Sequence, residues 1–518
     1  MITITEDKQV VLFRWLWVLS AVAFLAVTLI SLSPNLTIHH YRQSQTAITS
    51  LYLSLSEFKL SYLTPIMGSP WTVPMEFPLY QYLALVIHKF SGIDLIVAGK
   101  VINISAHIIN NLLLLAIGKR LNISSAAVYI ALIFYNLFPF YLVFDTVFLI
   151  DTFSLTLCLQ AIYFLCEWFH YSKKYTSLFF FTIFGTLCGL SKSTTFIGIL
   201  APATALLFFY YANRQSVFAK PLRLSLTKLR FFLLATTGFV LAFFITFMWV
   251  KYADAVKQGN PLSAMWTSSA TRTWNFGTLE QRLSINNWKQ YFTYSMLSHL
   301  SSYMLVGILF VLFSVLSDKK QKLAALSLLL LYLAPLFFFF NLFFIHTYYS
   351  TANILFLYLF FGYMFWVVVS AKNRFARVSG WAVLLLFFVF GLYRSYAFRH
   401  QIIKNKPEPG VYSQLNRLPI QPKPNDVIVV VQNSRDPYIG FYFKCRSINL
   451  NEAEYVTNGK AEGIKKLAGG LPIVMLCIVS DDSLNVLPAN YQGIFTERYK
   501  TISVSHYPET NKYYNFFW

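Results

Sequence analysis

The sequence has little charge and few cysteines. Only 12% of its 518 residues are charged, whereas 56% are hydrophobic and 18% aromatic. A soluble domain of this length carries about twice that charged fraction, so the composition excludes one. The five cysteines lack the spacing of a metal site, and three of them, Cys158, Cys166 and Cys188, fall in hydrophobic runs as small packing residues. Cys445 and Cys477 lie in the tail, where sequence alone does not decide whether they pair.

Acidic residues are also scarce, since 21 Asp and Glu stand against 42 Lys and Arg, a net charge of +21. In a soluble protein this excess would suggest nucleic acid, but here much of it lies in loops between long apolar runs. Each run can cross a hydrocarbon core about 30 Å thick. We therefore predict a polytopic α-helical membrane protein that binds no nucleic acid. About eleven spans are expected, near residues 15–32, 95–118, 124–143, 147–169, 176–191, 194–212, 231–250, 296–316, 323–345, 349–370 and 379–397.

Basic loops predict the orientation of these spans. The first span is too long for a signal-peptide core and lacks a small-residue cleavage site, so it is expected to stay uncleaved. Basic residues precede it and follow each even-numbered span, and the positive-inside rule makes that side cytoplasmic. The loops 33–94 and 251–295 and the tail after 398 are then outside, in a multi-pass protein of the inner (plasma) membrane. The basic residues are Lys8, Arg14, Lys119, Arg120, Lys173, Lys174, Arg214, Lys220, Arg223, Lys228, Arg230, Lys319, Lys320, Lys322, Lys372, Arg374 and Arg377.

The chain divides into three parts. Residues 1–398 form the transmembrane domain, the proline-containing stretch 399–424 reads as a linker, and 425–518 is predicted to be a small α/β domain. Its expected elements are strands at 426–431 and 472–479 and a helix at 453–468. The domain lacks a Gly-rich nucleotide fingerprint, so we expect a stabilising or acceptor-docking module.

The first outer loop, residues 33–94, is more than a connector. Apolar residues from Ile48 to Phe58 recur at helical spacing, which predicts an amphipathic helix lying in the membrane interface. Pro78 fits the start of a second short helix, Leu79–Phe90, because proline lacks only an N–H that a first turn leaves unpaired. The loop is therefore expected to fold as a cap.

Polar residues converge on the predicted outer face from five segments. Ionisable groups at membrane depth are costly, so their default interpretation is functional, although Asp145 could be a helix cap and His346 an interfacial anchor. Cations suit a phosphate, carboxylates a general base or sugar hydroxyls, and aromatic rings a sugar or polyprenyl chain. The candidates are Glu76, His39, His40, Asp151 and Asp145 for catalysis, Lys192, Arg42, Arg272 and Arg282 for a donor phosphate, and Gln43, Gln45, Tyr80, Trp274, His346, Tyr348 and Tyr349 for substrate binding. This set describes a lipid-anchored substrate whose leaving group is a phosphate.

The chain resembles the GT-C membrane glycosyltransferases, in the branch of the protein O-mannosyltransferases and the lipid A aminoarabinose transferase. The resemblance implies a sugar donor on a polyprenyl phosphate, a glycan, lipid or protein acceptor, inversion at the anomeric carbon and an active site under the first outer loop. It is carried by His39–Ala47, Glu76–Leu83, Asp151-Thr152, Gly189–Lys192, Trp274–Gly277, His346–Tyr349, Arg435-Asp436-Pro437 through Tyr442, and Lys444–Arg446.

One position departs from that family. Relatives place an aspartate in the first loop as the expected base, whereas residues 36–42 contain none and present His39 and His40 instead. Glu76 lies at a helix start, whose dipole stabilises its charge and weakens it as a base. Glu76 is therefore expected to orient the acceptor or act as base, with proton removal otherwise falling to one of the histidines.

A membrane transporter or flippase of a lipid-linked or anionic substrate is the alternative. A transporter should show polar or broken spans near the bilayer midplane and two matching halves. Here the charged groups gather at one face and no halves match. No ligand set has the spacing diagnostic of a divalent cation, so metal dependence stays open, as do the sugar, the acceptor and the prenyl length.

Overall fold

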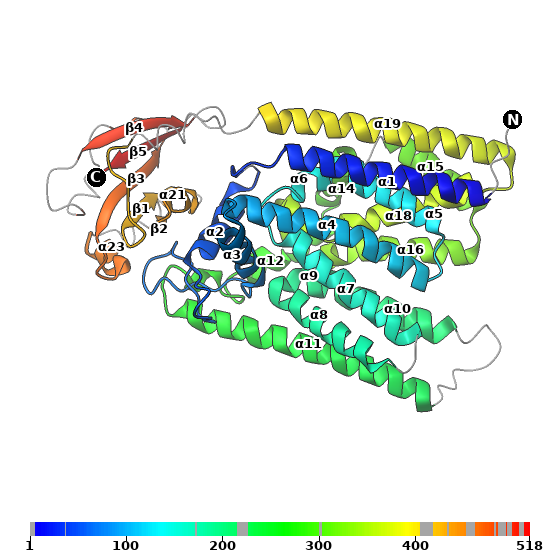
Figure 1. Cartoon of the computed structure of the whole chain (residues 1–518), viewed down its shortest axis with the longest axis horizontal. Coiled ribbons are helices and arrows are strands. Elements are labelled where there is room, and N and C mark those ends of the chain that lie inside the picture. The colour runs from blue at the N-terminus through cyan, green and yellow to red at the C-terminus, as the bar shows by residue number, and fades with distance from the viewer. Residues whose placement is uncertain are drawn as a thin grey trace.

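The helical part of the protein ends in a small sheet at one end of the molecule (Figure 1). The structure is a computed structural model, and it describes residues 6–36, 38–170, 174–214, 226–299, 303–404, 418–432, 435–451, 461–480, 483–484, 494, 500–506 and 512–518. The sheet lies beside the short helices of the first loop, α2 and α3, and not beside the opposite ends of the long helices.

The long helices coincide with the predicted spans. Seven of them are long and apolar enough to cross a membrane, and four shorter apolar helices fall on the remaining predicted spans; the number of crossings itself stays a prediction. These helices are α1 (Glu6–Ile30), α4 (Leu95–Arg120), α5 (Ser125–Leu137), α7 (Asp151–His170), α8 (Tyr175–Ser191), α10 (Ala201–Arg214), α11 (Leu226–Gln258), α15 (Tyr303–Leu316), α16 (Lys319–Phe338), α18 (Ile354–Val369) and α19 (Arg374–Lys404).

Short helices continue several spans at their ends. The short helix α6 (Pro139–Phe144) follows α5, and α9 (Ser193–Thr195) with the π-helix η1 (Phe196–Leu200) leads into α10. The loop after α11 folds into α12 (Arg272–Phe276), α13 (Leu279–Leu283) and α14 (Ile285–His299). The remaining short elements are η2 (Ala264–Trp266), α17 (Phe340–Ile345) and the 3-10 helix η3 (Thr347–Thr351).

Helices α5 and α18 form the centre of the bundle. Gly362 of α18 allows this contact, since a Cβ there would lie 2.7 Å from the Cβ of Ala131. Around it the rings of Phe134, Phe138 and Tyr358 are fully buried and pack against one another. Aromatic side chains therefore fill the centre of the bundle, while other phenylalanines, such as Phe179 and Phe244, are exposed on its surface.

The first loop folds differently from the prediction in one respect. Its helix α2 spans His40–Tyr52, not 48–58, and Leu55 and Phe58 lie beyond its end as exposed residues. The polar residues Thr49 and Ser50, which an amphipathic helix with Ile48 on its apolar face would turn toward water, are buried. Both hydroxyls donate to backbone carbonyls one turn earlier. The helix is buried on all sides from Gln43 to Ser50. The second predicted helix is confirmed as α3 (Leu79–Ser91).

The C-terminal part contains a five-stranded sheet in the order β2-β1-β3-β5-β4. β1 pairs in parallel with β2 and β3, while β5 pairs antiparallel with both β3 and β4. The two predicted strands are confirmed as β1 (Val427–Val431) and β3 (Ile473–Ser480). The predicted helix is present as α23 (Ala461–Ala468). The first part of that predicted helix, 453–460, and most of the predicted linker lie outside the described residues. The prediction missed α21 (Tyr438–Tyr442), β2 (Arg446–Leu450), β4 (Thr501–His506) and β5 (Lys512–Phe517).

All five cysteines are free and buried.

The first loop lies along the edge of this sheet. Met67 forms an antiparallel bridge with Ile448 of β2, and the Ser447 amide donates to the Pro65 carbonyl at 2.9 Å. The Asn260 side chain, from the loop after α11, donates to the carbonyls of Met67, Gly68 and Ser69. Three segments distant in sequence are thereby joined over one end of the bundle.

Candidate functional site

A buried lysine–aspartate pair lies at the start of α7. Lys192 occupies the single extended residue between α8 and α9, and its ammonium donates to Oδ1 of Asp151, the first residue of α7. The two side chains are 9% and 5% exposed. The ammonium also lies 4.1 Å from the ring centre of Tyr349 and 5.3 Å from that of Tyr348. Burial lowers the pKa of Lys192, and the neighbouring Asp151 carboxylate opposes that shift.

A second pair comes from the first loop. An Arg42 guanidinium nitrogen lies 2.8 Å from a carboxylate oxygen of Glu76, and its other terminal nitrogen donates to Gln45 at 2.6 Å. The Gln81 amide of α3 donates to the second Glu76 oxygen at 2.8 Å. Both oxygens of the carboxylate are therefore engaged by fixed donors.

The two pairs belong to one site. The backbone joins them, because the Phe77 amide, next to Glu76, donates to the carbonyl of Leu190, two residues before Lys192, at 3.0 Å. The Arg42 charge accordingly lowers the pKa of Lys192 and the Glu76 charge raises it. Within the described part of the chain, Asp151 Oδ2 and the Ser191 hydroxyl are buried without a hydrogen-bond partner. Unpaired buried oxygens beside two cations are suited to the hydroxyl groups of a polar ligand.

The predicted histidines border this site. His39 has a left-handed backbone with φ 53°, and its Nε2 lies 3.0 Å from the Thr347 hydroxyl oxygen, while its ring meets Tyr348 edge-on. Burial, with His346 and His40 nearby, lowers the pKa of His39 to about 4. Burial together with the Lys192 and Arg42 charges lowers the pKa of His346 as well. Both rings are therefore neutral at physiological pH.

His40 is linked to the C-terminal sheet domain. Its Nε2 lies 2.6 Å from an Asp436 oxygen, in the segment between β1 and α21, and its ring meets Tyr438. The other Asp436 oxygen accepts the Tyr438 amide at 2.9 Å, which fixes the carboxylate. Asp436 belongs to the sequence motif Arg435-Asp436-Pro437, but the sequence alone assigns it no role. The His40 ring thus has a fixed carboxylate against one of its two nitrogens.

Two predicted substrate-binding residues, Tyr80 and Gln43, contact the scaffold instead. Tyr80 is 1% exposed, and its hydroxyl donates to the Gly99 carbonyl at 3.0 Å, so it is a packing residue of α3 on α4. The Gln43 amide donates to Ile38 O and accepts the Phe148 amide at 2.9 Å. Gln43 therefore holds backbone and presents no free amide face.

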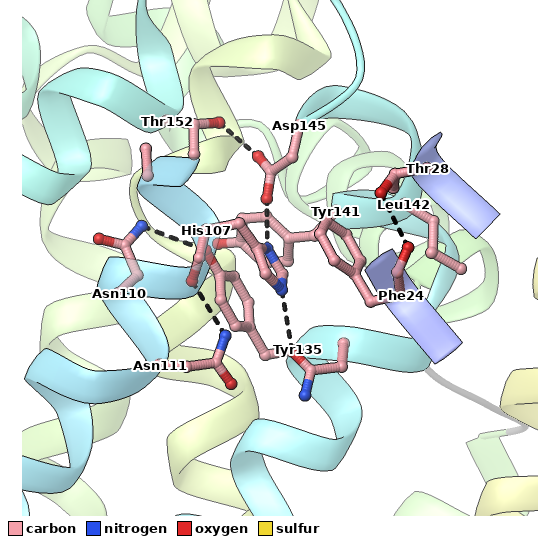
Figure 2. Close-up of polar contacts among 12 residues, drawn as sticks. Phe24, Thr28, His107, Asn110, Asn111, Tyr135, Tyr141, Leu142, Asp145 and Thr152 are labelled. Atoms are coloured by element: carbon pink, nitrogen blue, oxygen red, sulfur yellow. Dashed lines mark hydrogen bonds and ion pairs between the residues drawn. The ribbon is translucent and has the colours of Figure 1, made fainter. Parts of the chain in front are cut away.

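The remaining corrections concern charged residues. Arg282 donates to the carbonyls of Phe276, Phe337 and Phe338, so it caps helix ends and is not placed to bind a phosphate. Asp145 is fully buried between His107 and Thr152, each of which occupies one carboxylate oxygen (Figure 2). It therefore has no open face for a substrate. Arg272 is exposed on α12, while Trp274 of the same helix meets His346 at 5.7 Å between ring centres.

Sequence reasoning also missed Gln81 and Thr347, which contact Glu76 and His39. Gln81 lies in the quoted Glu76–Leu83 stretch, and its position five residues after Glu76, across a helix start, was the available signal. Within the described ranges, no three His, Cys, Asp or Glu side chains are gathered closely enough to hold a metal ion.

Comparison with known proteins places this geometry in a known architecture. No family model matches the chain, and no curated protein matches it by sequence. Among solved structures, ArnT from Cupriavidus metallidurans bound to undecaprenyl phosphate superposes with a TM-score of 0.61 at 12% identity, over 96% of this chain and 97% of that one. The chain has the GT-C fold. The archaeal oligosaccharyltransferase AglB from Archaeoglobus fulgidus is more distant, with a TM-score of 0.47 at 12% identity over 90% of this chain and 69% of that one. The GT-C architecture, together with its apolar helices, makes this a multi-pass membrane protein.

Proposed function

We propose that the protein is a membrane glycosyltransferase that moves a sugar from a polyprenyl-phosphate donor to an acceptor. The observation that carries the proposal is the pair of buried ion pairs, Lys192–Asp151 and Arg42–Glu76, which share one site beneath the first loop. A GT-C chain that matches nearly its whole length to a structure holding undecaprenyl phosphate supports it.

The donor phosphate is expected to bind between the two cations. Each cation already faces a carboxylate, so the charges of the site balance when no donor is bound. An anion is attracted only at a position where both Lys192 and Arg42 can contact it. Lys192 offers a compact charge and Arg42 a planar fork, which together fit a phosphate from two directions. The Tyr349 ring beside Lys192 limits where that ammonium can point.

The chemical step is a single displacement with inversion. The acceptor nucleophile attacks the anomeric carbon, the bond from that carbon to the phosphate oxygen breaks, and the polyprenyl phosphate leaves with the electron pair. Lys192 and Arg42 stabilise the charge that develops on the leaving phosphate, because only 9% and 20% of their side-chain surfaces are exposed to water. Their contribution rises as the bond breaks, which is what accelerates the step.

The proton of the acceptor is expected to pass to His40. The Asp436 carboxylate behind it stabilises the imidazolium that forms, whereas the lowered pKa of His39 makes that ring a weaker base. Glu76 is engaged by Arg42 and Gln81, so its proposed role is to orient Arg42 and the acceptor. The missing first-loop aspartate is thereby replaced by a histidine supported from the C-terminal domain.

The site is proposed to face the outer side of the inner (plasma) membrane, with the N-terminus in the cytoplasm. The basic loops lie at the ends of the helices opposite the first loop: Lys119 and Arg120 end α4, and Lys319 begins α16. A donor that enters from the lipid then reaches Lys192 from the outer leaflet.

Reconstitution in proteoliposomes tests the proposal. The purified protein should bind undecaprenyl phosphate and consume an undecaprenyl-phosphate sugar when an extract of cell-envelope lipids and glycans is supplied as acceptor, with the transferred sugar detected by mass spectrometry. A Lys192→Met/Asp151→Asn variant is the matched control because it keeps the site neutral. Movement of the lipid-linked sugar across the bilayer with no transfer product would instead establish the flippase alternative, which no observation on the described residues favours.

A further inference from the structure

A row of buried polar side chains lies along one face of α4. Lys100, Asn103, His107 and Asn110 follow one another at helical spacing, and each is at most 2% exposed. Polar groups this deep in a membrane helix are retained where they satisfy other polar groups. Two of the four, Asn103 and His107, reach the non-helical segment between α6 and α7.

This segment, residues 145–150, has buried backbone that no helix satisfies. The Asn103 amide donates to the carbonyls of Val147 and Leu149, at 2.7 and 2.8 Å. From the other side, Gln43 of α2 accepts the Phe148 amide. Irregular backbone at membrane depth is tolerated only with its polar groups paired. The side chains of α4 and α2 therefore set the path of the chain into α7.

His107 holds the beginning of the same segment. Its Nδ1 lies 2.6 Å from Asp145 Oδ2, and its Nε2 lies 2.8 Å from Asn136 Oδ1. The ring is stacked between Phe24 and Tyr135, with ring centres 3.7 and 4.0 Å away, so it cannot turn. Figure 2 shows the Asp145 carboxylate between His107 on one side and the Thr152 hydroxyl on the other.

We propose that His107 is a positioning residue: through Asp145 and Thr152 it fixes the first turn of α7 and so holds the Asp151 carboxylate against Lys192. Thr152 directly follows Asp151, so a rotation of this turn would move both side chains together. Asp151 is held by Lys192 through one oxygen only, and its other oxygen has no partner among the described residues. Its direction therefore depends on the backbone that carries it.

Packing alone does not require the polar chain. An apolar pair of the same volume would fill the space as well or better than a buried His–Asp pair. What the pair adds is direction, since a short hydrogen bond fixes the carboxylate angle as well as its place. That Lys192 binds the donor phosphate rests on the proposed function. The contacts that lead from His107 to Lys192 do not depend on it.

Substitutions at His107 separate the hydrogen bond from the ring. His107→Asn places an amide N–H near the position of Nδ1 and keeps the bond to Asp145. His107→Phe keeps the stacked ring and removes the donor. Because His107→Phe leaves a buried carboxylate unpaired and could misfold, His107→Phe/Asp145→Leu makes the interior apolar on both sides. Asn110→Ala is the matched control, because Asn110 lies on the same face of α4 and its amide donates to Tyr135.

The first readout is the reactivity of Lys192 toward an amine acylating reagent, followed by peptide mass spectrometry on the whole chain in nanodiscs. We expect acylation about tenfold or more faster in both phenylalanine variants, approaching the rate in Asp151→Asn, because a charge-assisted hydrogen bond to Lys192 is released. His107→Asn and Asn110→Ala should keep the wild-type rate. A folded His107→Phe/Asp145→Leu protein that protects Lys192 as the wild type does would overturn the proposal.

The second readout is the Kd for undecaprenyl phosphate. It should rise in the phenylalanine variants and be restored in His107→Asn, while thermal unfolding reports whether each variant is folded. If the wild type binds no undecaprenyl phosphate, the proposed function fails, and the labelling rates alone decide for or against positioning by His107.

Discussion

Replacement of Lys192 is the most direct test of the proposed donor site. Lys192 and Asp151 are a pair of opposite charges with 9% and 5% of their side chains exposed. Removing the ammonium takes one charge-assisted contact from the donor phosphate, worth about 1.5–3 kcal/mol, or a factor of about 10–150 in affinity. It also leaves the Asp151 carboxylate buried without its cation, which destabilises the fold by about 3–5 kcal/mol. A simple Lys192→Ala variant would therefore confuse loss of binding with loss of folded protein.

A set of three variants separates the two effects. Lys192→Met should lower both the unfolding temperature and the affinity. Adding Asp151→Asn removes the stranded charge, so Lys192→Met/Asp151→Asn should recover most of the stability and none of the affinity. Asp151→Asn alone keeps the ammonium but no longer holds it in place, so it should weaken donor binding by less than Lys192→Met does. Lys192→Arg should restore binding in part, because a planar fork replaces a compact ammonium on the Tyr349 ring.

Two measurements decide the outcome. Thermal unfolding in detergent or nanodiscs reports the stability of each variant, and isothermal titration with undecaprenyl phosphate reports its Kd. The reasoning is refuted if the Lys192→Met/Asp151→Asn protein is folded and binds undecaprenyl phosphate within about twofold of the wild type, since a lost charge contact predicts at least about tenfold.

Three further predictions concern groups around the site. The pKa of His39 is lowered from 6.5 to about 4, so between those two pH values the unfolded chain binds a proton at His39 that the folded chain does not. The stability of the fold should therefore decrease as the pH drops through this range, and His39→Gln should flatten the pH dependence of the unfolding temperature. Tyr80→Phe removes the hydrogen bond to the Gly99 carbonyl and should lower the free energy of unfolding by about 0.5–1.5 kcal/mol without changing the rate of sugar transfer. A large loss of transfer rate would show that Tyr80 belongs to the active site after all. A cysteine placed at the exposed position Leu279 (Leu279→Cys) should react with a membrane-impermeant maleimide in intact cells, because all native cysteines are buried. Lys320→Cys should react only after the cells are permeabilised, and the reverse pattern would contradict the predicted orientation.

Much of the fold could be predicted because hydropathy is a local property. The spans need only apolar runs of sufficient length, so α4 matches its predicted span closely, while α11 contains its predicted span and extends beyond it at both ends. The helix of the first loop was misplaced for the opposite reason. Its buried face includes Thr49 and Ser50, whose burial depends on the α3 and C-terminal segments that enclose α2, and periodicity cannot report that.

The candidate site was predictable in its cations and less so in their partners. Lys192 was conspicuous as a lysine on the side poor in basic residues, and in the structure it pairs with Asp151, which the sequence had proposed only for catalysis. The support of His40 by Asp436 joins residues almost 400 positions apart, and no spacing rule connects them. Asp145 was misassigned because a buried carboxylate held by His107 has the same sequence signature as a catalytic one.

The strand pairing between the first loop and β2 has a consequence for how the protein is made. The Asn449 amide donates to Ile66 O across 383 residues, so the loop that caps the site is synthesised long before its partner. Contacts this distant form late, because the chain entropy of closing so long a loop is lost before the contact compensates for it. The first loop must therefore wait in an incomplete state while the remaining helices insert. The proposed site would then be completed only at the last stage of biogenesis, once the C-terminal sheet has formed.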